Sequence, residues 1–251
     1  MPIDLKPYRK INGNVLKIIA CITMLIDHIG AAIIIPVNQA GLIPDHETFE
    51  KIKTIYKACR WIGRSAFPIF CFLLVEGFIH TKSRLRYALS LLCFALLSEL
   101  PYDYAFDTGS DQCNVMWTLF IAFITLWGIE FIKKWLEDKK LPTVLYYMLS
   151  GILMIPAILL AEYIHCDYRG YGIALVIIFY FLRPFDYVNL IAGFLFISLM
   201  PNESHAFPAF ILMAFYSGLQ GKKLGNLKYL FYAYYPVHLT ILYLIRYALC
   251  N

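Results

Sequence analysis

An apolar run near the start of the chain constrains the fold more than any other feature of the sequence. Residues 15–36 read VLKIIACITMLIDHIGAAIIIP. About 20 such residues are enough to cross a bilayer as a helix. Asp27 and His28 nevertheless lie near the middle of this run, and an ionisable side chain at that depth costs at least roughly 2.5 kcal/mol. Helix formation alone does not explain that cost, so we take the pair as the candidate functional centre.

Composition extends this interpretation to the whole chain. Of 251 residues, 60% are hydrophobic and 16% are charged, and the mean hydropathy is +0.63. Soluble domains are about half apolar and a quarter charged, so we predict an all-α, polytopic bundle forming one integral membrane domain over residues 1–251. The net charge of +5 does not indicate a nucleic-acid partner. The basic residues lie in short loops between apolar runs, where they set membrane orientation.

Hydropathy predicts nine membrane spans. They lie near residues 15–36, 56–80, 85–101, 114–132, 142–163, 170–182, 187–200, 206–218 and 229–249. The sixth to eighth have about 13 residues, or some 20 Å of helix, so we expect one or two of them to tilt, kink or re-enter. Helices are required because lipid cannot satisfy exposed backbone groups.

Charged residues in the loops predict the topology. The N-terminal segment and alternate loops are basic: Lys6, Arg9, Lys10 and Lys17, then Lys82, Arg84 and Arg86, then Lys133, Lys134, Lys139 and Lys140, then Arg183, then Lys222, Lys223 and Lys228. The intervening loops are mainly acidic, although the first of them also holds Lys51 and Lys53. Basic loops favour the cytoplasm. We therefore predict a multi-pass protein of the cell membrane, with bacterial inner membrane the expected location, a cytoplasmic N-terminus and an external C-terminus.

The first span holds a second charged residue besides Asp27. Lys17 precedes His28 by eleven residues, which returns nearly to the same helix face with a rise of roughly 16 Å. A long anionic ligand entering from the cytoplasm could therefore touch both side chains. Alternatively, Lys17 extends to lipid phosphate and His28 bonds to a neighbouring helix.

Further polar residues lie in the second span. Arg60 and Arg64 share a helix face near its outer end, and Glu76 and His80 share one near its inner end. Arg64 needs a carboxylate partner, for which Asp27 and Glu99 are the candidates. The alternative interpretation is a structural ion pair that ties helices together.

The third, fourth and last spans carry the remaining candidates. Four polar residues, Glu99, Asp103, Asn114 and Thr118, lie near the predicted outer ends of the third and fourth spans. Together they could form a polar vestibule for an acceptor; alternatively, they cap helices and meet headgroups. His238 in the last span lies near the predicted midplane, beside Pro236.

Motifs of other enzyme classes are missing from the sequence. It contains no HEXXH, GXSXG, Walker or dinucleotide-binding fingerprint. Its seven cysteines have no zinc-type spacing, so we expect no metal site. Cys113 and Cys166 fall in predicted outer loops and could pair, but we expect free thiols.

Four segments resemble the TraX family. They read LKIIACITMLIDHIG, RWIGRSAFPIFCFLLVEGFIHTKSRLRYALSLLCFALLSELPYDYAF, NVMWTL and the closing YYPVHL. The family's namesake acetylates the N-terminus of conjugative pilin. The family in turn resembles the wider transmembrane acyltransferases, including acyltransferase-3 proteins, which use cytoplasmic acetyl-CoA. Their first helix carries Arg, ten residues, then His. Lys17 and His28 fit that spacing, although lysine lacks the planar fork of arginine.

The resemblance implies an acetyl-CoA-dependent N- or O-acetyltransferase. His28 would act as general base or as nucleophile. Asp27 is the second catalytic candidate and, about 100° round the helix, would pair with Arg64 or His238. The predicted acyl-CoA contacts are Lys17, His80, Lys82, Arg84, Arg86 and His238. The predicted lining of the acceptor site is Arg64, Glu76, Glu99, Asp103, Asn114 and Thr118. The acceptor stays open between a peptide, a glycan and a lipid-linked group.

Two other classes of function fit some of the same residues. Buried Asp, Glu, His and Arg also serve proton relays, so a small proton-coupled transporter is the main alternative. Against it, the sequence has no paired broken segments in corresponding halves, which secondary transporters usually have. The third possibility is a membrane scaffold with structural ion pairs and no catalysis.

Overall fold

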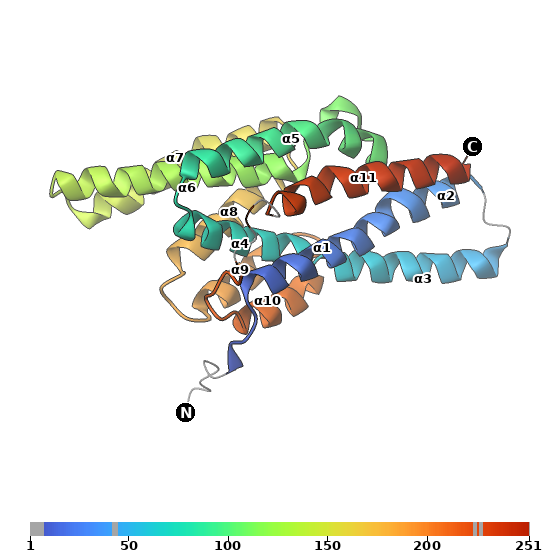
Figure 1. Cartoon of the computed structure of the whole chain (residues 1–251), viewed down its shortest axis with the longest axis horizontal. Coiled ribbons are helices and arrows are strands. Elements are labelled where there is room, and N and C mark those ends of the chain that lie inside the picture. The colour runs from blue at the N-terminus through green and yellow to red at the C-terminus, as the bar shows by residue number, and fades with distance from the viewer. Residues whose placement is uncertain (1–7, 42–44, 223–224, 226–227, 251) are drawn as a thin grey trace.

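The computed structural model describes residues 8–41, 45–222, 225 and 228–250, and these are almost entirely helical, with no β-strand among them. Its α-helices, shown in Figure 1, are α1 (Gly13–Ile29), α2 (Ile35–Gln39), α3 (His46–Gly63), α4 (Ala66–His80), α5 (Arg84–Phe106), α6 (Val115–Asp138), α7 (Thr143–Tyr163), α8 (Arg169–Phe181), α9 (Val188–Ile197), α10 (Phe207–Ala214) and α11 (Lys228–Cys250). Lys6, Lys223 and the side chain of Lys228, which we used for the topology, lie outside the described part.

The first span is a continuous helix of 27 residues, Gly13–Gln39. Asn12 begins it, because its side-chain oxygen accepts a hydrogen bond from the backbone N–H of Val15 at 3.1 Å. A π-helical turn, Gly30–Ile34, begins two residues after His28 and separates α1 from α2. Insertions of this kind occur frequently at functional sites, so the local backbone also distinguishes the region of Asp27 and His28.

Each of the nine predicted spans coincides with helix, and the predicted fold class is confirmed. Five helical segments are long and apolar enough to cross a membrane. As expected, α8 to α10 are short, with 13, 10 and 8 residues. The exposed side chains of α7 are largely apolar, Val144, Ile152, Ile155 and Leu159 among them. Such a surface is suited to lipid.

The second predicted span is longer than expected. Its helical segment, Glu47–His80, has 34 residues, which is about 50 Å of helix, whereas the hydrocarbon core of a bilayer is about 30 Å thick. The first half of α3 is also charged, with Lys51 paired to Glu47 and Lys53 to Glu50. We infer that this half extends beyond the hydrocarbon. The helix breaks at Arg64 and Ser65, between α3 and α4.

Helix α4 lies at the centre of the bundle, and most of its residues are buried. It packs against α1, α6, α8 and α10. Around it, α5 lies beside α11, α1 beside α3, and α6 and α7 form a hairpin (Figure 1). The aromatic core includes Phe78, which contacts Phe123 edge to face with ring centroids 5.3 Å apart.

Two loops meet beside this core. Cys113 and Cys166 lie opposite one another, because the Asp167 N–H donates to the Cys113 carbonyl at 2.9 Å and the Cys113 N–H donates to the His165 carbonyl at 3.3 Å. Both cysteines are free thiols, as expected.

Candidate active site

His28 is held by a chain of hydrogen bonds that joins α1 to α11. Its Nδ1 lies 2.7 Å from Nε2 of His238, and Nδ1 of His238 lies 2.7 Å from the carbonyl oxygen of Tyr234. A carbonyl can only accept, so His238 carries its proton on Nδ1 and, when neutral, accepts at Nε2. His28 must then donate from Nδ1. Its Nε2 is left as an unprotonated lone pair, which is the form a general base requires.

His28 lines a cavity of about 270 Å³, together with Asp27 and Arg64. Within the described part of the chain, its Nε2 makes no hydrogen bond. Phe106 packs edge-on against the imidazole, with ring centroids 5.1 Å apart. His238 itself is buried and does not line the cavity. The relay therefore fixes the orientation of His28 from behind, on the side away from the open space.

Asp27 forms an ion-pair network rather than a contact with either histidine. Its carboxylate lies 2.6 Å from Arg60 and 3.5 Å from Arg64, and Arg64 also lies 2.6 Å from Glu203. The predicted pairing of Arg64 with Asp27 is confirmed. Gly63 permits it, since a Cβ there would lie 2.2 Å from the Asp27 side chain. These ion pairs hold α1 against the α3–α4 break.

The sequence-based selection of site residues missed Asp167, which lines the His28 cavity from the loop between α7 and α8. The hydroxyl of Thr118 donates to its backbone carbonyl, and the Tyr168 N–H donates to its carboxylate at 3.0 Å. His165 and Tyr168 in this loop, and Arg169 at the start of α8, all have positive φ, at 49°, 60° and 43°. Such strained backbone concentrates at functional sites. Burial raises the pKa of Asp167 to about 6.

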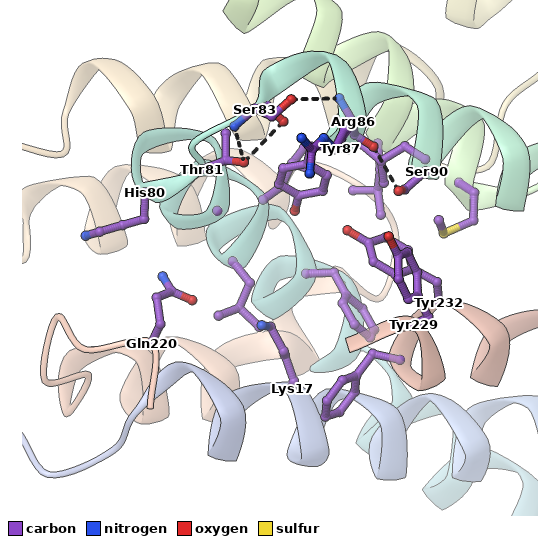
Figure 2. A pocket seen from close by; sticks show the side chains of 18 of the residues that line it. Lys17, His80, Thr81, Ser83, Arg86, Tyr87, Ser90, Gln220, Tyr229 and Tyr232 are labelled. Atoms are coloured by element: carbon purple, nitrogen blue, oxygen red, sulfur yellow. Dashed lines mark hydrogen bonds between the residues drawn. The ribbon is translucent and has the colours of Figure 1, made fainter. Parts of the chain in front are cut away.

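A second cavity of about 440 Å³ contains Lys17, His80, Lys82 and Arg86. Figure 2 shows Lys17 on α1 facing the turn that joins α4 to α5. No carboxylate lines this cavity, and among the described residues no ion pair reaches Lys17, Lys82 or Arg86. The Lys17 ammonium lies 5.8 Å from the centre of the Phe231 ring. We call this space the basic cavity.

The two cavities lie at opposite ends of the same helices. On α1, Lys17 lines the basic cavity and His28 the other; on α5, Arg86 and Tyr102 are divided in the same way. Phe70 lines both. Lys17 and His28 therefore line separate cavities that share Phe70 as a wall, and a single ligand that contacts both residues has to pass Phe70.

Residues 12–246 match the family described as TraX protein. The chain belongs to the TraX family. It is also 28% identical over 255 residues to the probable fimbrial assembly protein FimC, serogroup H1, of Dichelobacter nodosus. That alignment covers 90% of this chain and 92% of the relative. No solved structure matches this chain. The family match includes every residue named above for the two cavities, so both belong to the TraX region of this multi-pass membrane protein.

The structure corrects two of the predicted acyl-CoA contacts in this TraX chain. Arg84 does not line the basic cavity; it forms an ion pair with Glu130 and lies over the Phe78 ring, 4.6 Å from its centre. His238 lines neither cavity and instead supports His28. The position of each of these two side chains is set by the partner that it contacts. Neither hydropathy nor residue spacing identifies that partner.

The structure does not place the predicted acceptor vestibule at either cavity. Glu99 accepts from Asn114 Nδ2 at 2.6 Å and from Trp117 Nε1, while Asn114 Oδ1 accepts from the Met116 N–H at 2.9 Å and begins α6. This is the helix-capping alternative. Asp103 accepts from the Thr108 hydroxyl at 3.2 Å. None of these three predicted residues lines either cavity.

Two other residues predicted to line the acceptor site have structural partners. Glu76 is buried and lies 2.7 Å from Arg183, and the Tyr216 hydroxyl donates to it at 3.2 Å. Thr118 supports the Asp167 backbone. Of the predicted acceptor residues, only Arg64 lines the His28 cavity.

Proposed function

We propose that this protein is a membrane-embedded acetyltransferase, which moves an acetyl group from acetyl-CoA to an amine or hydroxyl of an acceptor. The observation that carries the proposal is the relay from Tyr234 through His238 to His28. It leaves an imidazole lone pair open to a cavity inside a membrane protein. A scaffold would need no such oriented base.

The basic cavity suits the donor. Lys17, Lys82 and Arg86 supply positive charge that no carboxylate in the cavity neutralises, and charge-assisted hydrogen bonds to phosphate are among the strongest in proteins. CoA offers three phosphate groups. A volume of about 440 Å³ falls in the range of small-molecule sites. With the predicted topology, this cavity opens toward the cytoplasm, where acetyl-CoA is available.

The chemistry then runs across the Phe70 wall. His28 Nε2 takes the proton of the acceptor amine or hydroxyl as that atom attacks the thioester carbonyl. Arg60 and Arg64 line the same cavity and would stabilise the oxyanion of the tetrahedral intermediate. Its collapse breaks the C–S bond, and the CoA thiolate takes the proton back from His28. In the alternative route, the same lone pair of His28 attacks first and carries the acetyl group.

The acceptor would enter the His28 cavity from the side opposite to the cytoplasm. Loops predicted to lie outside the cell, with Thr108, Gln112 and Asp167, border the His28 cavity. The name of the Dichelobacter nodosus relative places that protein in fimbrial assembly. This supports a fimbrial peptide as one acceptor, with a surface glycan the other candidate. We propose the bacterial inner membrane as the location.

Loss of the imidazole tests the proposal. Membranes containing the full chain would be incubated with radiolabelled acetyl-CoA, and the labelled product identified. His28→Ala should reduce label transfer by about 10²–10⁴-fold, the contribution of a positioned base. His238→Ala should reduce it less, because the base remains but loses its fixed tautomer. His165→Ala is the matched control, because the His165 side chain is exposed and, among the described residues, hydrogen-bonds only to the Asp111 carbonyl.

Near-normal transfer by His28→Ala, in a variant that inserts and remains monodisperse, would end the assignment. A second arm uses proteoliposomes loaded with buffer alone. Accumulation of a labelled solute without any acetylated product would favour the transporter class instead.

A further inference from the structure

A third hollow lies on the outer side of α3. It has a volume of about 420 Å³ and is lined by Tyr56, Lys57, Arg60, Trp61, Arg64 and Asn202. Five of these residues recur at intervals of three, four or one along the chain, which places them on a single helix face. We call this the α3 groove.

The groove is positively charged. Three of its six lining residues are cations and none is a carboxylate. Arg60 and Arg64 are held from behind by Asp27 and Glu203, but Arg60 uses only Nη1 in hydrogen bonds within the described part of the chain. Lys57 is exposed and has no ion pair among those residues. The groove therefore holds fixed guanidinium donors and one free ammonium.

Aromatic rings complete the surface. Trp61 stacks face to face on His205, with ring centroids 4.7 Å apart and planes 9° from parallel. It is nevertheless 48% exposed, so part of the indole remains open. Tyr56, five residues earlier on α3, lines the same groove. Such rings offer flat apolar contact beside the charged groups.

The groove lies next to the His28 cavity, because Arg60 and Arg64 line both. A molecule in the groove therefore lies against the same guanidinium groups that border the candidate base. We propose that the α3 groove binds the acceptor, and that the acceptor carries a carboxylate or phosphate close to the amine or hydroxyl that is acetylated. The acetylation step rests on the proposed function; the binding of an anion does not.

The anionic group has two possible sources. It could belong to a water-soluble peptide or glycan, or to the headgroup of a membrane lipid that carries the acceptor. Both present the same chemistry to Lys57 and Arg60. The test below separates them.

The experiment compares two probes that differ by one phosphate, glucosamine 6-phosphate and glucosamine. Binding to the full chain in phosphatidylcholine nanodiscs is measured by calorimetry. We expect the phosphate-bearing probe to bind at least tenfold more tightly. Lys57→Gln should reduce that preference to about threefold or less. Lys51→Gln, on the same helix but paired with Glu47 outside the groove, should leave it unchanged.

Equal binding of the two probes, or binding of neither, would overturn the proposal, as would a preference that survives Lys57→Gln. Nanodiscs that contain phosphatidylglycerol distinguish the sources: competition with the probe would assign the groove to a lipid headgroup, and unchanged binding to a soluble acceptor. His28→Ala should keep the phosphate preference. Should acetyl transfer fail while this preference persists, the proposed function falls and the groove remains an anion site.

Discussion

The two cavities on either side of Phe70 both contain basic residues, but these differ in whether a carboxylate is paired with them. In the His28 cavity, Arg60 and Arg64 are neutralised by carboxylates at 2.6–3.5 Å. In the basic cavity, Lys17, Lys82 and Arg86 have no acidic partner within the described residues. Breaking a buried pair leaves an uncompensated charge, so the first set also maintains the structure, in addition to its proposed contacts with the substrates. The second set is free to bind a ligand.

The largest effect should come from breaking the paired set. Arg64→Ala removes the partner of Glu203, which is almost fully buried, and one partner of Asp27. Removing one member of a buried pair costs about 3–5 kcal/mol, so we expect little folded protein in size-exclusion chromatography and a much lower Tm. Lys82→Gln, from the basic cavity, should leave the Tm unchanged. Equal Tm values for both variants would remove the distinction between the cavities.

The same distinction explains how far the sequence could be interpreted. Hydropathy was sufficient to predict the positions of nine helical segments, because apolar helices are favoured both in lipid and in a protein core. The cost of charge in lipid made Asp27 and Arg64 natural partners. A charge on Glu99 would have the same cost in lipid, but its carboxylate accepts hydrogen bonds from the nearby Asn114 and Trp117. Spacing along the chain shows which helix face a carboxylate lies on, but not which donor is nearest to it. The sequence alone therefore does not distinguish Asp27 from Glu99.

Asp167 could not have been selected for a further reason. Its place in the cavity depends on a loop that turns inward through left-handed backbone and on hydrogen bonds to Cys113 and Thr118. None of these has a signature in the sequence around it. The position of Phe70 between the cavities likewise depends on the packing of α4 against its neighbours.

A smaller, selective effect should follow from neutralising the unpaired set. In Lys17→Gln/Arg86→Gln, the KM for acetyl-CoA should rise at least about tenfold, because each charged hydrogen bond contributes roughly 1.5–3 kcal/mol. The kcat should change little, since neither residue lines the His28 cavity. Kinetics with radiolabelled donor measure both constants. Lys133→Gln, at an exposed site on α6, is the control. A fall in kcat without a rise in KM would contradict a donor-binding role.

Phe70 should control passage between the cavities. Phe70→Ala removes the side chain that both share, so we expect longer thioesters to reach His28, with transfer from butyryl-CoA rising about three- to tenfold relative to acetyl-CoA. Phe70→Trp should lower both. Such ratios correspond to the roughly 1–3 kcal/mol by which an apolar pocket discriminates on size. An unchanged donor ratio in both variants would show that the wall lies elsewhere.

The smallest effect concerns Asp167, the carboxylate of the His28 cavity for which no ion pair occurs in the described part of the chain. Burial raises its pKa to about 6 from an ordinary value of 3.8, so the folded state favours the neutral acid. Its contribution to stability should be complete below pH 4, decline between pH 4 and 6, and stay constant above. Thermal unfolding in detergent should therefore give a Tm that falls by a few degrees across that window relative to Asp167→Asn. Asp111→Asn, an exposed neighbour, should follow the wild type. If the difference between wild type and Asp167→Asn did not vary with pH, Asp167 would be solvated like the surface carboxylates.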